Sequence, residues 1–170
     1  MNAATPAPVD RVAEIMAAWE RERPDLDSSP QGVIARLHRV ALALTERLVA
    51  VYAQFDLSEG EFDVLATLRR AGEPYERAAG DLADHTLVTT GGLTKRVDRL
   101  EARGLVERRV EASDARRRLV RLTPAGRDLI DRAFTAHLAN EHRLLDELGS
   151  ADAAALEPIL ARWLTLLDPR

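Results

Sequence analysis

The spacing of apolar residues changes from helical to strand-like within the segment 93–122. Leucine and valine recur every three or four residues from 93 to 100, as in an amphipathic helix, and Gly104 follows where such a helix ends. Apolar and charged residues then alternate over 105–110 and 118–122, which is typical of two strands joined by a loop. A helix followed directly by a charged hairpin predicts a helix-turn-helix unit with a β-wing.

The chain around this segment is predicted to be helical. A short helix around 76–84 and a connector complete the helix-turn-helix, and Thr89 or Thr90 is expected to cap its second helix. Ser58 and Glu61 form a capping box for the helix that comes before. Further amphipathic helices are expected on both sides of this unit.

We therefore expect a mainly α fold with a small β-wing, in which helices from both chain ends flank a winged helix-turn-helix domain. The flanking helices have more apolar surface than so small a domain covers, which indicates that they form a dimer. The predicted boundaries are 1–29 for an N-terminal extension with a short helix, 56–123 for the winged helix-turn-helix, and 30–55 and 124–168 for the dimerisation helices.

Positive charge is concentrated in the same segment. Between Lys95 and Arg121 there are ten Lys or Arg residues against five Asp or Glu, so this stretch carries +5 in a chain whose total is −4. The remainder therefore carries −9. A basic unit in an otherwise acidic chain is typical of a surface that binds the phosphate backbone of nucleic acid.

Composition and the N-terminal sequence exclude several classes of protein. Cysteine is absent, which excludes disulfides, thiol redox sensing and thiolate zinc sites. The N-terminus lacks the basic and apolar stretches of a signal peptide, and no apolar run approaches the roughly 20 residues of a membrane span. We expect a cytoplasmic protein that does not bind membranes.

Signatures of catalysis and metal binding are missing as well. The histidines include no pair four residues apart and no HExxH motif, and the chain has no P-loop, dinucleotide-binding fingerprint or nucleophile elbow. We therefore expect no enzymatic activity, no metal and no cofactor.

The basic segment predicts a set of contacts with double-stranded DNA. Threonines and glycines at the start of the second helix would let backbone N–H groups approach a phosphate, although a weakly formed helix start is the alternative explanation. The wing arginines suit a narrow minor groove, unless they are a solvated charge cluster. The residues expected to contact DNA are Thr89, Thr90, Gly91, Thr94, Lys95, Arg99, Arg116, Arg117 and Arg118.

The order of these elements resembles the MarR family of bacterial transcription regulators. The resemblance covers residues 33–167, and its most specific part is Asp114 and Arg116 followed by Leu122-Thr123-Pro124. It implies that residues 30–170 form a MarR-like domain, that Asp114 orients Arg116 toward the minor groove, and that the second helix of the unit reads the major groove.

A narrower resemblance is to the urate-responsive subgroup of this family. It rests on the additional N-terminal helix with Trp19, the pair Phe62-Asp63, Arg96 in the second helix, and Arg108 in the first wing strand. This resemblance implies that Trp19 and Arg108 contact an anionic ligand, while Asp63 and Arg96 couple the ligand site to DNA.

Two of these residues also have structural explanations. Arg108 shares a strand face with Val106 and Val110, so we expect it to point inward, where a guanidinium needs either a protein carboxylate or a bound anion. Trp19 is equally suited to anchor its helix by packing.

The expected function is that of a homodimeric repressor on a pseudo-palindromic operator with half-sites about 10 bp apart. A small anion that enters near Asp63 and competes for Arg96 would loosen the second helix and release the DNA. Urate, other purine products and tricarboxylates all fit this effector. The alternatives are a MarR-like regulator that responds to no small anion and a helical adaptor that binds protein.

Overall fold

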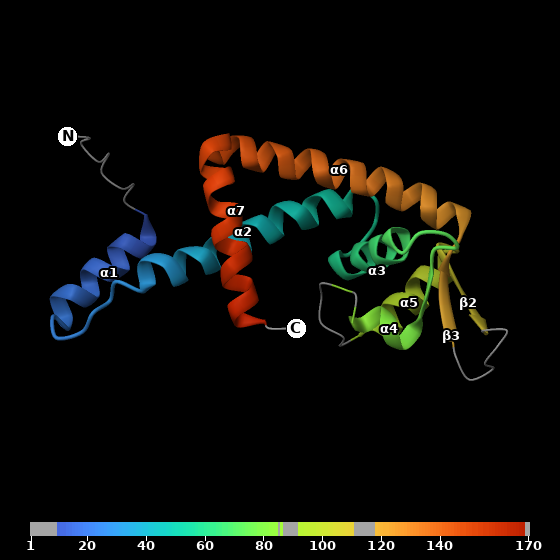
Figure 1. The fold of residues 1–170 in the computed structure, drawn as a ribbon, viewed down its shortest axis with the longest axis horizontal. Helices are drawn as coiled ribbons and strands as arrows, with labels where there is room; N and C mark the ends of the chain where they lie inside the picture. The colour runs from blue at the N-terminus through green and yellow to red at the C-terminus, as the bar shows by residue number, and fades with distance from the viewer. Residues whose placement is uncertain (1–9, 85, 87–91, 111–117, 169–170) are drawn as a thin grey trace. The chain divides into compact units, whose positions relative to one another are not determined.

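The computed structural model describes residues 10–84, 86, 92–110 and 118–168 (Figure 1). The chain divides into two compact units, residues 1–47 and 48–170, whose boundary falls within the long helix α2 (Gln31–Ala53). Within the described ranges, no helix is long and apolar enough to span a bilayer, and no cluster of His, Asp and Glu side chains could hold a metal ion.

The first unit contains α1 (Arg11–Glu22) and the beginning of α2. The carboxylate of Asp10 caps α1 by accepting from the Ala13 backbone N–H at 2.9 Å, and it pairs with Arg36 Nε of α2 at 2.7 Å. The hydrogen bond from Arg36 lowers the pKa of Asp10 to about 2. Val12 is the buried residue of α1, and the Asp10–Arg36 ion pair joins the start of α1 to α2.

The second unit has a winged helix-turn-helix fold, and the expected mainly α class with a small sheet is confirmed. The elements that follow α2 are α3 (Glu59–Arg70), β1 (Glu76–Ala78), α4 (Ala79–Asp84), α5 (Leu93–Ala102), β2 (Val106–Val110), β3 (Arg118–Leu122), α6 (Pro124–Leu148) and α7 (Ser150–Leu167).

Helix α3 is the centre of the second unit and lies between α6 and α5 (Figure 1). Its capping box is present, since the Ser58 backbone N–H donates to Glu61 Oε2 at 2.9 Å and the Glu61 N–H donates to Ser58 Oγ at 3.4 Å. Burial disfavours the charged form of Glu61, but hydrogen bonds from Ser58 and Arg99 outweigh it and lower the pKa of this carboxyl. Leu65 and Leu68 are fully buried, so α3 is a fixed support for the helices that pack on it.

Three antiparallel strands form the sheet, in the order β1-β3-β2. The hairpin of β2 and β3 agrees with the sequence prediction, but the helical prediction for 76–78 is wrong, because Arg77 pairs with Val120 of β3 and α4 starts only at Ala79. A strand of three residues is too short to show alternation, so its pairing with the free edge of β3 is what defines it. The predicted wing tip, 111–117, lies outside the described residues.

Helix α5 begins at Leu93, later than the sequence predicted. Its N-cap residue is Gly92, whose φ of 94° lies in the left-handed region that favours glycine. The predicted cap at Thr89 or Thr90 is therefore wrong. Gly92 precedes the helix and turns the chain into it, so this glycine does not weaken the helix interior.

Candidate nucleic-acid interface

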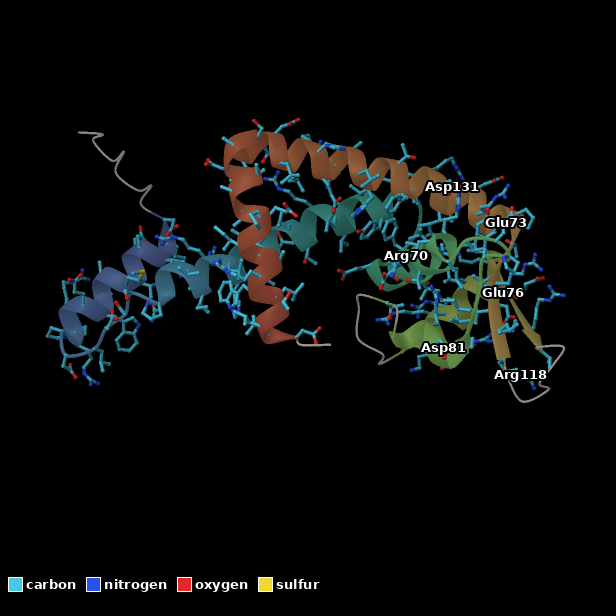
Figure 2. All side chains as sticks on the ribbon, viewed as in Figure 1. Arg70, Glu73, Glu76, Asp81, Arg118 and Asp131 are labelled. Carbon is cyan, nitrogen blue, oxygen red and sulfur yellow. The ribbon has the colours of Figure 1, made fainter. Side chains whose placement is uncertain are left out.

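The outward face of α5 carries two of the residues predicted to contact DNA. Val97 and Leu100 are buried, whereas Thr94 and Lys95 are exposed. Arg118 is exposed at the start of β3, at the far end of the wing strands (Figure 2). The remaining predicted contacts at the helix start and the wing tip lie outside the described residues: Thr89, Thr90, Gly91, Asp114, Arg116 and Arg117.

Two further arginines on one side of α5 contact α3 and the loop before it. Arg99 Nε lies 2.8 Å from Glu61 Oε1, so it pairs with the carboxylate that closes the capping box. Arg103 Nη1 donates to the Asp56 carbonyl at 2.6 Å. The Arg99 side chain is still 55% exposed, so its ion pair leaves part of the guanidinium open to DNA.

Arg96 lies against Gly60 of α3. A Cβ atom at Gly60 would be only 2.2 Å from Arg96 Nε, so the absence of a side chain there makes room for the arginine. Gly60 is three residues before Asp63, which is buried and has Arg70 Nη1 at 3.9 Å. Because residues three apart share a helix face, the structure brings Arg96 to the face of α3 that carries Asp63.

Arg108 joins the first wing strand to α5. Its backbone N–H donates to Glu101 Oε1 at 3.0 Å, its Nη1 bonds Glu101 Oε2, and its Nη2 lies 2.5 Å from Asp98 Oδ1. Burial alone lowers the pKa of the guanidinium, but the hydrogen bonds to Asp98 and Glu101 outweigh it and the pKa is raised. We call Arg108, Asp98 and Glu101 the clamp, because they fasten β2 to α5.

The inward orientation expected for Arg108 is only partly right. Arg108 pairs with the buried Val120 across the sheet, so it does lie on the face that packs against α5. However, β2 is an edge strand, and the side chain extends to the rim of the core, where it is 32% exposed. Two carboxylates of the protein supply the anion that this guanidinium requires.

Asp98 and Glu101 are not among the residues predicted from the sequence. They lie three residues apart on α5, and the turn at Gly104, with a φ of 67°, leads the chain from the helix into β2. The sequence pattern that could have indicated this cluster is the pair of carboxylates before Gly104 and the arginine after it. Helical and strand periodicities do not extend across such a turn, so neither one relates Glu101 to Arg108.

Trp19 is only about half buried in the structure. Its side chain is 47% exposed and lines a shallow hollow of about 280 Å³ with Ile15, Ala18 and Glu22. Trp19 belongs to the first unit, whereas Asp63, Arg96 and Arg108 belong to the second. Half-burial is compatible both with packing of the indole and with contact to a ligand, so the role of Trp19 stays a prediction.

Comparison with known proteins identifies the family of the chain. A model of the MarR family matches residues 55–117. The HTH-type transcriptional regulator PecS of Dickeya dadantii is 37% identical over 151 residues, which are 89% of this chain and 91% of that protein. The multiple antibiotic resistance protein MarR of Salmonella typhimurium is 32% identical over 123 residues, 70% of this chain and 82% of that protein.

A solved structure of mutant MarR from E. coli, complexed with operator DNA, has the same fold. It superposes with a TM-score of 0.68 at 27% identity and covers 82% of this chain and 99% of that one. These relatives are similar to the chain over most of their length. The chain belongs to the MarR family of DNA-binding transcriptional regulators.

Proposed function

We propose that this protein is a homodimeric repressor that binds a pseudo-palindromic operator in the cytoplasm and is released by a small anion, urate or a related organic acid. The observation that carries the proposal is the clamp. Its arginine, paired with Asp98 and Glu101, lies between the wing and the helix whose outer face carries Thr94 and Lys95, so an anion that displaced these carboxylates would act on both elements.

Exposed cations and charge pairing support the operator contacts. Lys95, Arg99 and Arg118 are cationic and exposed, and a duplex would exchange its condensed counterions for them. Asp98 and Glu101 lie on the same helix and would repel phosphates if they were unpaired. The charge of Arg108 offsets one of these two negative charges, so pairing in the clamp reduces the repulsion that α5 would present to the DNA backbone.

Apolar helix surfaces support the homodimer. None of the described residues of α7 is buried, although the helix carries many large aliphatic side chains. Phe134, Leu138 and Leu145 of α6 are also at least 40% exposed. So much apolar surface on two adjacent helices is typical of an oligomer interface, and a two-fold dimer would present two recognition helices to a pseudo-palindrome.

The clamp also suggests how an anion would release DNA. An effector carboxylate or urate anion that binds Arg108 competes with Asp98 and Glu101, detaches β2 from α5 and leaves two unpaired carboxylates beside the DNA backbone. This is the differential interaction between the bound and released states that a ligand-driven shift requires. An anion close to Asp63 would in the same way compete for Arg96 and loosen the contact of α5 with α3.

The proposal is tested by fluorescence-anisotropy titration of a duplex from the region upstream of the protein's own gene. We expect salt-sensitive binding that urate or another small organic acid weakens, and we expect Arg108→Ala to bind the duplex while losing that response. Glu107→Gln is the control, since Glu107 is adjacent to Arg108 but outside the clamp. An Arg108→Ala variant with the full response would remove Arg108 from the effector site.

Two other functions make different predictions in the same titration. A MarR-like regulator without an effector would bind the duplex with an affinity that no anion changes, and Arg108 would then only position the wing. A helical adaptor would bind neither the upstream duplex nor random DNA. Membership of the MarR family and the exposed cations of α5 favour DNA binding over the adaptor.

A further inference from the structure

A cleft of about 400 Å³ lies at the base of the wing, where the loop before β1, the strands β2 and β3 and the start of α6 meet. Figure 2 shows Glu73 of this cleft near the start of α6 and Arg118 at the opposite end of the wing strands. Glu107, which also lines the cleft, is next to Arg108 in β2 and therefore faces the other side of the sheet from the clamp. The cleft is thus distinct from the proposed operator and effector contacts.

Two guanidinium groups line this cleft. Arg121 Nε donates to the Pro74 carbonyl at 3.1 Å, and Arg127 Cζ lies 5.7 Å from the centroid of the Tyr75 ring. In the part of the chain that the structure describes, neither arginine forms an ion pair within 4.0 Å, although the chain has 28 Asp and Glu against 24 Lys and Arg. Both charges are therefore open to an anionic group of a ligand.

Two carboxylates line the same cleft without pairing with these arginines. Glu107 is directly opposite Arg121 in the register of β2 and β3, yet its ion pair is with Arg109 Nε at the limiting distance of 4.0 Å. Glu73 accepts a 3.4 Å hydrogen bond from the Tyr75 hydroxyl. The cleft is therefore lined by guanidinium and carboxylate groups that do not pair with each other. Such a lining suits a ligand that carries both a negative and a positive charge.

The backbone of Tyr75 is strained at the edge of this cleft. Its φ of 62° lies in the left-handed region, where an aromatic residue is unusual. Hydrogen bonds from the Tyr75 N–H to the Gly72 carbonyl at 2.6 Å and from the Leu122 N–H to the Tyr75 carbonyl at 3.0 Å hold this conformation. Strain of this kind persists only where the surrounding structure holds the residue in place, and the residue held here, Tyr75, lines the cleft.

We propose that this cleft binds a small zwitterion of the free amino acid class. Arg121 and Arg127 hold the carboxylate of the ligand, while Glu73 and Glu107 hold its ammonium group. The ligand joins the loop before β1 to the wing and to α6, so its binding stabilises the base of the wing. This site does not depend on the effector site proposed at Arg108.

The test is isothermal titration calorimetry of the full chain with each of the common L-amino acids. Acetate and methylammonium serve as probes that carry only one of the two charges. We expect at least one amino acid to bind roughly tenfold more tightly than either single-charge probe, because two charged contacts act together. Arg121→Gln and Glu107→Gln should each weaken that binding roughly tenfold, whereas Arg132→Gln, an exposed arginine of α6 outside the cleft, should leave it unchanged.

Three outcomes overturn the proposal. The first is the absence of binding by any amino acid, and the second is binding that Arg121→Gln does not weaken. The third is tighter binding by Glu107→Gln, which would identify a site for simple anions. Removal of a carboxylate from the cleft strengthens the binding of an anion but weakens the binding of a zwitterion, whose ammonium group loses a partner. Thermal unfolding of each variant verifies the fold, and Arg127→Gln replaces Arg121→Gln if the latter does not fold.

Discussion

The substitution Gly60→Ala moves Arg96 without changing any charge. The added Cβ would lie 2.2 Å from Arg96 Nε, while ordinary contacts begin at 3.4 Å, so the guanidinium must move by about 1.2 Å. The atoms that collide belong to the flexible part of an arginine, so the move costs little energy. Alanine is also the better helix former, by about 0.5–1 kcal/mol, and α3 should be as stable as before.

The expected defect is therefore in regulation and not in folding. If Arg96 couples the effector to α5, its displacement removes much of a coupling free energy that is typically about 1–3 kcal/mol. The effect of the anion on operator affinity should then shrink by roughly fivefold or more. The measurement is operator anisotropy with and without the anion, together with the thermal midpoint of the variant.

Gly80→Ala is the matched control, because Gly80 lies in α4 of the same domain and a Cβ there meets nothing within 4 Å. It should keep both operator affinity and anion response. A Gly60→Ala variant with the wild-type anion response would refute the role of Arg96 in coupling. A variant of much lower stability would show instead that the arginine cannot move as the geometry indicates.

Three further outcomes follow from the described contacts. The pKa of Asp10 is lowered in the folded chain, so the Asp10–Arg36 pair stabilises the folded state at pH values above about 4, and this stabilisation is lost as the pH falls toward about 2. The thermal midpoint of Asp10→Asn should lack this part of the pH dependence. Leu164 is 65% exposed, so if α7 forms part of the proposed dimer interface, Leu164→Glu should leave the helical circular dichroism intact and shift sedimentation from dimer to monomer. Lys95→Gln should lower the salt dependence of operator binding by about one ion, measured as the slope of affinity against salt.

The local features of the fold could be predicted from the sequence because they depend on residues close together in the chain. The capping box at Ser58 needs only the residue three positions later, and the hairpin of β2 and β3 shows its alternation directly. Strand β1 could not be read, since its three residues are strand only through their pairing with β3. The start of α5 was misplaced because the left-handed conformation of Gly92 is a property of the folded turn.

In the candidate site too, local features could be predicted from the sequence and tertiary contacts could not. The exposure of Thr94 and Lys95 follows from the helical position of the apolar stripe, and the face of Arg108 follows from strand alternation. The partners of Arg108 do not follow from either rule. Their position depends on how β2 returns along α5 after the turn, and this is a tertiary contact between two different periodicities.

The clamp predicts that one substitution increases the affinity for the effector, whereas most substitutions in a binding site decrease it. If the effector anion binds Arg108, Glu101 is its competitor, and Glu101→Gln should bind the anion more tightly than the wild type. A partly exposed ion pair contributes at most about 1 kcal/mol, so the gain should not exceed roughly fivefold in the affinity of the DNA-free protein, measured by calorimetry. Glu107→Gln removes the same charge from the adjacent strand and separates a general electrostatic gain from release of the clamp. Equal or weaker anion binding by Glu101→Gln would mean that Arg108 does not exchange a protein carboxylate for the effector, and the release mechanism would have to act through Arg96.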